Sequence, residues 1–150
     1  DKKGVDILLA AMRRLHDAQN RKVPGLDIAG AGPLEDALRT QAADLPSVRF
    51  LGWQTPQQLD LIMLVVQAVV VPSRIATDSD CEYLLTVVLE SIWAGLPVVA
   101  SNHAGIPEII RDQETRFLVP ENDPASLAVA LLVLVQPRDH VQYMVANAQA

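Results

Sequence analysis

The chain has 150 residues, of which half are apolar and only 4% aromatic, and its formal net charge is −6. This length predicts one domain, and the composition favours buried parallel strands covered by amphipathic helices. The scattered basic residues and the negative charge argue against nucleic-acid binding. A lone cysteine, Cys81, excludes an internal disulfide framework and a thiolate metal cluster. With no secretory signal and no apolar run of membrane-spanning length, we expect a cytoplasmic protein.

Hydrophobic spacing and turn residues predict helices that alternate with short strands. Helices are expected over residues 4–20, 33–42, 56–66, 86–94, 106–111 and 124–135, with a helical tail over 138–150, and strands over 26–30, 48–51, 68–71, 97–101 and 117–119. Thr55 is an expected N-cap, and Gly95 an expected left-handed C-cap. Alternation of this kind implies right-handed crossovers and an α/β fold with an open, doubly wound parallel sheet.

Ligands of such sheets bind at the carboxyl ends of the strands, here residues 30–33, 52, 72–82 and 101–105. Glu82 and Glu90 fall on this edge, at the expected start of a helix whose free N–H groups can hold a phosphate. Eight helical residues rise about 12 Å. Two carboxylates at this spacing suit an elongated ligand with hydroxyls on both sides of a phosphate.

A dinucleotide site is a weaker interpretation of the glycine turn at Gly30 and Gly32. Its third glycine position holds Glu35, and the next strand does not end in a carboxylate for the ribose. Residues 78–80, Asp-Ser-Asp, could hold a divalent cation, but a solvated turn is the more common use of so short a motif. His103 on the ligand edge is a candidate for proton transfer or for a hydrogen-bonding role.

Eight short motifs occur in a characteristic order: KGVDILL at 3–9, IAGAGP at 28–33, VRFLG at 48–52, VPS at 71–73, Glu82 with Glu90, AGLPVVA at 94–100, GIPE at 105–108 and FLVP at 117–120. Together they resemble the C-terminal, donor-binding half of family 4 (group 1) retaining glycosyltransferases, which have the GT-B fold. The loop before Glu82 resembles the branch that builds exopolysaccharides such as colanic acid. The resemblance covers about residues 2–135.

The resemblance implies a UDP- or GDP-linked sugar donor, bound without metal or other cofactor, for transfer to a polysaccharide or lipid-linked acceptor. Lys3 would neutralise the donor diphosphate, and Glu82 would accept from hydroxyls of the donor sugar. Glu90 would accept from the ribose hydroxyls. Gly30, Gly32 and the loop at Gly52, which would border the base, would line the donor site. The backbone at Tyr83, Leu84, Leu85 and Thr86 would hold phosphate and sugar.

The resemblance also implies that residues 1–150 are a single nucleotide-sugar-binding domain without the N-terminal acceptor domain. We expect this domain to be inactive in isolation, and peripheral association of the full-length enzyme with the inner membrane face stays open. The family usually has Glu-Gly-x-Pro where this chain has Glu82-Tyr83-Leu84-Leu85, and Gly where it has Arg116. These departures keep an alternative open, a catalytically inactive nucleotide-sugar-binding or interaction module.

Overall fold

The structure is a computed structural model that describes residues 3–18, 23–74, 81–102 and 117–134, without the side chains of 81–85. In chain order its elements are α1 (Val5–Asp17), β1 (Leu26–Ala29), α2 (Glu35–Gln41), β2 (Val48–Gly52), α3 (Pro56–Met63), β3 (Val69–Val71), α4 (Cys81–Trp93), β4 (Val98–Ser101), β5 (Phe117–Val119) and α6 (Pro124–Leu134). The alternation of helices and strands expected from the sequence is therefore confirmed over the described residues.

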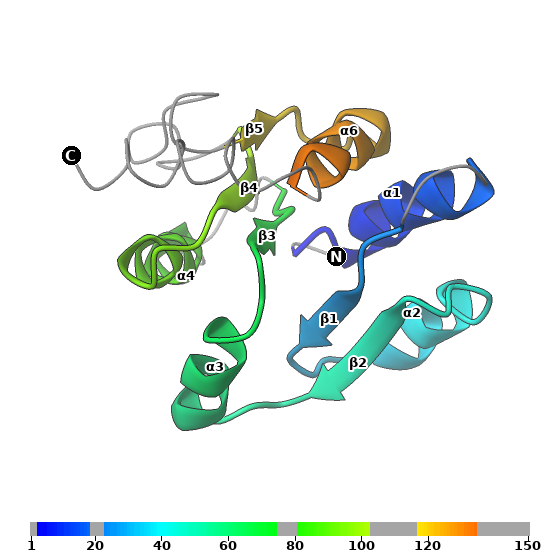
Figure 1. Ribbon diagram of the computed structural model, residues 1–150. Coiled ribbons are helices and arrows are strands. Elements are labelled where there is room, and N and C mark those ends of the chain that lie inside the picture. Colours follow the sequence, from blue (N-terminus) through cyan, green and yellow to red (C-terminus); the bar gives the residue numbers. More distant parts are fainter. Residues whose placement is uncertain (1–2, 19–22, 75–80, 103–116, 135–150) are drawn as a thin grey trace.

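All described strand pairs are parallel, and their hydrogen bonds form two sheets, β1-β2 and β3-β4-β5. Figure 1 shows the strands across the molecule in the order β2-β1-β3-β4-β5, so that β1 and β3 are the facing edges of the two sheets. The chain leaves β1 toward β2 on one side and leaves β3 toward β4 on the other. This reversal of direction is what makes an α/β sheet doubly wound, although one continuous sheet was expected.

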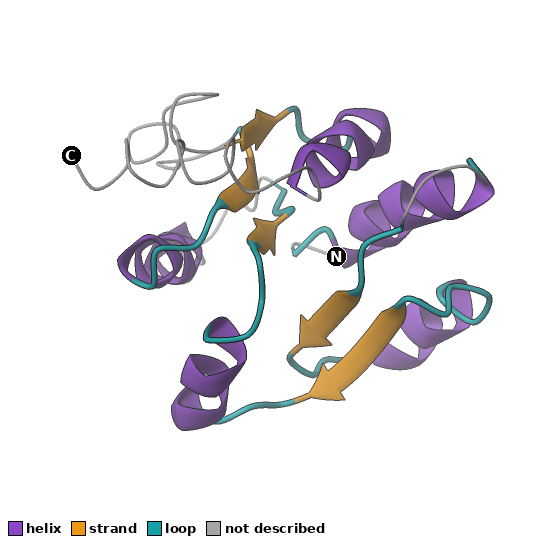
Figure 2. Cartoon of the chain, viewed as in Figure 1, coloured by secondary structure: helices purple, strands orange, loops and turns teal. Residues whose placement is uncertain are grey.

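Helices cover both faces of the strands. Figure 2 shows α1, α2 and α6 on one side and α3 and α4 on the other. The larger core cluster lies under the first group, where Leu9 and Met12 of α1 pack with Val99 of β4 and Leu127 of α6. Leu26 and Ile28 of β1 pack against the same cluster. A core shared by both sheets therefore holds them together where no hydrogen-bonded ladder does.

The helix ends follow the expected local chemistry. The Thr55 hydroxyl accepts from the backbone N–H of Gln58, whose side chain accepts from the Thr55 N–H, a complete capping box. Asp123 caps α6 by accepting at 3.0 Å from the backbone N–H groups of Ala125 and Ser126. The Ser126 hydrogen bonds lower the pKa of Asp123. Gly95 after α4 has the left-handed φ of 72° that the sequence predicted.

The largest difference from prediction is the start of α4, which begins at Cys81 and not at Thr86. Residues 82–85 contain neither Gly nor Pro, and Glu and Leu are good helix formers, so nothing in this stretch stops the helix from extending toward the N-terminus. Smaller differences are the earlier ends of α1 and α3 and the start of α2 at Glu35, after a turn at 33–34. The expected helix over 106–111 and the tail over 138–150 lie outside the described residues.

Candidate functional site

Two glycine turns at the ends of β1 and β2 form one side of the candidate site. Gly30 and Gly52 have φ of 126° and 69°, conformations that side chains disfavour. The Gly30 N–H donates to the Gly52 carbonyl at 2.7 Å, so the two turns are joined to each other. A β carbon built on Gly30, Gly32 or Gly52 would meet nothing within 4 Å. The backbone here is open to close approach by a ligand.

The start of α1 lies against the end of β3. Gly4 has a left-handed φ of 65°, and a β carbon placed on it would come 1.8 Å from the Pro72 carbonyl oxygen. Only glycine therefore fits at this contact. The contact places the neighbouring Lys3, which is exposed, at the carboxyl end of β3. Lys3 is thus on the edge where its expected role requires it.

A second contact joins the same two segments. The Arg74 guanidinium, just after β3, donates to Asp6 in the first turn of α1 at 2.5 Å. Both side chains are partly buried, with exposed fractions of 25% and 34%. Ser73 beside them is fully buried. This ion pair was missed by sequence reasoning because its partners are 68 positions apart, and no local pattern signals it.

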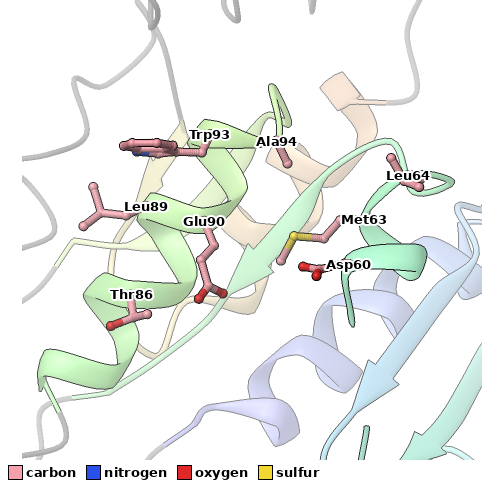
Figure 3. A pocket seen from close by; sticks show the side chains of 8 residues that line it. All are labelled: Asp60, Met63, Leu64, Thr86, Leu89, Glu90, Trp93 and Ala94. Carbon is pink, nitrogen blue, oxygen red and sulfur yellow. The ribbon is translucent and has the colours of Figure 1, made fainter. Parts of the chain in front are cut away.

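Glu90 lies in a groove of about 600 Å³ between α3 and α4. The groove is lined by Asp60, Met63, Leu64, Thr86, Leu89, Glu90, Trp93 and Ala94. Figure 3 shows the Glu90 carboxylate directed toward α3, where Asp60 and Met63 face it. The lining contains two carboxylates and no basic residue, so it suits hydroxyl donors and disfavours a phosphate. Asp60 and Met63 were not among the predicted site residues.

The expected phosphate-holding backbone at 83–86 is only partly placed as predicted. Because α4 begins at Cys81, the N–H groups of Leu85 and Thr86 belong to its hydrogen-bonded second turn. The N–H groups free for a ligand are those of the first turn, which includes Glu82 and Tyr83. The side chains of Glu82, Tyr83, Leu84 and Leu85 are outside the described part of the structure. The Thr86 side chain lines the groove beside Glu90.

Other candidates from the sequence remain unplaced. His103, Arg116 and the Asp-Ser-Asp turn at 78–80 lie outside the described residues. Among the residues that are described, no cluster of three or more His, Cys, Asp and Glu is arranged to hold a metal ion. No helix in the described part combines the length and apolar character needed to cross a membrane.

Comparison with known families identifies a relationship over most of the chain. Residues 1–137 match the family model described as "Glycosyl transferases group 1". Among curated relatives, the amylovoran biosynthesis glycosyltransferase AmsK of Erwinia amylovora is 33% identical, over 100% of this chain and 37% of AmsK. The putative colanic acid biosynthesis glycosyltransferase WcaL of Salmonella typhimurium is 31% identical, over 87% of this chain and 32% of WcaL. The chain thus spans about a third of the length of these relatives.

Solved structures show the same fold. Anabaena HepE, crystallised with UDP and glucose, superposes with a TM-score of 0.79 at 22% sequence identity, over 99% of this chain and 39% of HepE. The Rossmann-like architecture of a GT-B glycosyltransferase that the sequence predicted is confirmed. The two departures from that prediction are the split sheet and the early start of α4.

Proposed function

Because this chain belongs to the glycosyl transferases group 1 family, we propose that it is the donor-binding C-terminal domain of a retaining glycosyltransferase that takes a UDP- or GDP-linked sugar. The acceptor would be a polysaccharide or lipid-linked sugar, bound by a separate N-terminal domain. The chain would then be inactive in sugar transfer by itself. The full-length enzyme would act in the cytoplasm. Peripheral association with the inner face of the membrane is compatible with this proposal.

One observation supports this proposal above others, the separation of charge across the ligand edge. Lys3 lies where α1 meets the end of β3, beside the Asp6–Arg74 ion pair, whereas the charged residues that line the groove between α3 and α4 are both carboxylates, Asp60 and Glu90. A nucleotide sugar has a matching distribution, with a dianionic diphosphate between two hydroxyl-bearing rings. The site therefore offers charge of the right sign to each part of such a donor.

In this proposal each residue type has a distinct role. Lys3 neutralises the diphosphate, and the free N–H groups at the start of α4 hold its oxygens. Glu82 accepts from donor-sugar hydroxyls, and Glu90 accepts from the ribose hydroxyls. The open backbone at Gly30, Gly32 and Gly52 accommodates close approach of the nucleoside.

The reaction would need no metal, because the positive charge comes from the protein. As the bond between the anomeric carbon and the diphosphate breaks, negative charge grows on the leaving group. Fixed cations and helix N–H groups stabilise that charge more in the transition state than in the ground state. Glu82 would hold the donor sugar in place during this step.

A catalytically inactive binding module is the second candidate, and the extended α4 supports it. The helix continues through residues 82–85, where the family usually has Glu-Gly-x-Pro. A helical backbone and a large Tyr83 side chain leave less room for close approach of the sugar. Fusion of this chain to the N-terminal part of AmsK distinguishes the two: sugar transfer or donor hydrolysis supports the enzyme, and donor binding without either supports the module.

The experiment that tests the donor site is calorimetric titration of the chain with UDP, GDP, UDP-glucose and GDP-mannose in the presence of EDTA. We expect saturable binding of nucleotides of at least one base. Glu90→Gln should weaken it about tenfold to a hundredfold, because a hydrogen bond to a charged group contributes about 1.5–3 kcal/mol. Asp17→Asn, at the far end of α1, removes the same charge and should leave affinity unchanged. Absence of binding by a folded chain would refute the donor site.

A further inference from the structure

Lys3, which is expected to neutralise the donor diphosphate, takes its place from the start of α1. The Gly4 carbonyl accepts at 3.1 Å from the N–H groups of Ile7 and Leu8, so the helix begins at Gly4 and Lys3 is one residue before it. The left-handed φ of 65° at Gly4 sets the direction in which the chain enters the helix. The position of Lys3 on the ligand edge therefore depends on what fixes Gly4.

The end of β3 supports this start from one side. Val71 and Ser73 are buried, and the Pro72 carbonyl between them faces Gly4. Figure 1 shows the beginning of α1 beside β3. Because a β carbon on Gly4 would come 1.8 Å from the Pro72 oxygen, the two segments cannot come closer together. This steric contact does not stop them from moving apart, so an attractive contact is also needed.

The Asp6–Arg74 ion pair supplies that attraction. Arg74 is three residues after the end of β3, and its guanidinium donates to Asp6 Oδ2 at 2.5 Å. Asp6 is in the first turn of α1, only three positions after Lys3. The pair therefore holds the first turn of the helix against the loop after β3, and Lys3 with it.

Stability alone does not explain why this pair is buried. Among the described residues, the other Asp6 oxygen, Oδ1, and the Ser73 hydroxyl are buried without a hydrogen-bond partner. A buried polar atom without a partner lowers stability, and a buried ion pair often contributes no more than apolar side chains of similar volume. What a charge-assisted hydrogen bond adds is a defined geometry between the groups that it joins. The arrangement thus favours position over stability.

We propose that Asp6 and Arg74 are positioning residues that hold Lys3 at the site of the donor diphosphate. This inference rests on the proposed function, because Lys3 has its role in that same donor site. The Arg74 charge is neutralised by Asp6, so the pair acts through the start of α1 and not on the donor itself. A lysine that is fixed in advance loses less conformational entropy when the diphosphate binds. The pair therefore contributes affinity for the phosphates and not for the nucleoside.

The distinguishing measurement compares a nucleoside diphosphate with its nucleoside by calorimetric titration. The ligands are UDP and uridine, or GDP and guanosine if the chain binds guanine nucleotides. Lys3→Gln should weaken the diphosphate affinity about tenfold to a hundredfold, as expected for the loss of one hydrogen bond between charged groups. Asp6→Asn and Arg74→Gln should each weaken it about threefold to tenfold, because Lys3 must then be ordered on binding. The nucleoside affinity should stay unchanged in all three variants.

A combined variant separates positioning from a general loss of structure. If Asp6 acts through Lys3, Asp6→Asn should have no further effect on the diphosphate affinity of a chain that already carries Lys3→Gln. A merely structural role would lower the affinity by the same factor with and without Lys3→Gln. Arg74→Lys, which keeps the positive charge, should retain most of the affinity that Arg74→Gln loses. Circular dichroism checks that each variant is folded.

The Arg13–Asp44 pair provides the matched control. It is an ion pair of the same helix, at 2.6 Å, in the half of α1 away from Lys3. Arg13→Gln should therefore leave the affinity for both ligands unchanged. The positioning role would be overturned, with the donor site left standing, by additive losses with Lys3→Gln, by equal losses for diphosphate and nucleoside, or by unchanged affinity in the Lys3, Asp6 or Arg74 variants. Failure of the wild-type chain to bind any nucleotide would overturn both.

Discussion

The Arg74 guanidinium donates to the Asp6 carboxylate at 2.5 Å and thereby joins the loop after β3 to the first turn of α1. Gly4 contacts the Pro72 carbonyl in the same region. Two contacts of different kinds, one ionic and one steric, therefore fix the position of Lys3 relative to the end of β3. Of the two residues with expected catalytic roles, Lys3 is on one of the joined segments, and Glu82 is in the first turn of α4.

The Asp6–Arg74 pair should contribute measurably to stability. In a double-mutant cycle with Asp6→Asn and Arg74→Gln, we expect a coupling energy of about 1 kcal/mol, since the pair is partly shielded from water. The control is the Glu35–Arg39 pair within α2, which is more exposed at its arginine and should give about 0.3–0.5 kcal/mol. Urea denaturation measures both, and an Asp6–Arg74 coupling no larger than the control would contradict the assignment.

Gly4→Ala should destabilise the chain by about 1–3 kcal/mol or more, because alanine strains the left-handed conformation and its β carbon overlaps the Pro72 carbonyl. Gly25→Ala is the matched control: its β carbon meets nothing within 4 Å, and its φ is not left-handed. That variant should be neutral or more stable by about 0.4–1 kcal/mol. Equal effects of the two substitutions, measured by urea denaturation, would show that α1 does not lie against β3 as described.

Asp44 should make the stability of the chain sensitive to acid. The side-chain hydrogen bond from Arg13, at 2.6 Å, lowers the pKa of Asp44 from 3.8 to about 2. A lowered pKa in the folded state means that the stabilising contribution is complete above about pH 4 and is lost as the pH falls through 2. The pair joins α1 to the turn between α2 and β2.

We therefore expect wild type to be more stable than Asp44→Asn at pH 5, with the difference shrinking between pH 4 and pH 2. The free energy of unfolding at several pH values measures this difference. Asp36→Asn, in the first turn of α2, controls for the loss of one negative charge. A difference between wild type and Asp44→Asn that stays constant down to pH 2 would contradict the ion pair.

Restoring the usual family sequence at the start of α4 should shorten that helix. Tyr83→Gly with Leu85→Pro removes the hydrogen bond from residue 85 to residue 81 and presets a new first turn. We expect a small loss of helical circular dichroism and tighter nucleotide binding, because more N–H groups become free. Val87→Pro, two residues further along, should unfold the chain, since Val87 packs on the core. Unchanged helicity would contradict the assigned start of α4.

Local sequence patterns predicted the elements well, since their signals lie within a few residues. The Thr55 capping box, the left-handed Gly95 and the alternation of strands and helices are of this kind. The glycine turns and Glu90 were placed on the ligand edge by strand order alone. The start of α4 was misplaced because the helix was predicted only from Thr86 onward, although residues 82–85 contain neither Gly nor Pro and can continue it.

Features that depend on tertiary contacts could not be predicted. Asp6 and Arg74 are distant in sequence, and either residue by itself is an ordinary surface charge. Asp60 and Met63 became groove residues only through the position of α3 beside α4. The division of the strands into two sheets likewise depends on the spacing of β1 and β3, which no local pattern encodes.

The pairing of β1 with β2 contains a shift of one residue at the ligand edge. Ile28 pairs with Phe50, but Ala29 pairs with Gly52, so Leu51 is an extra residue in β2. Because side chains alternate between the two faces of a strand, a single residue changes the face on which everything after it emerges. Deletion of Leu51 would keep every other residue, yet it would remove the shift that brings Gly52, and not Leu51, opposite Ala29. The number of residues in this short stretch therefore determines the shape of the ligand edge as much as the identity of their side chains does.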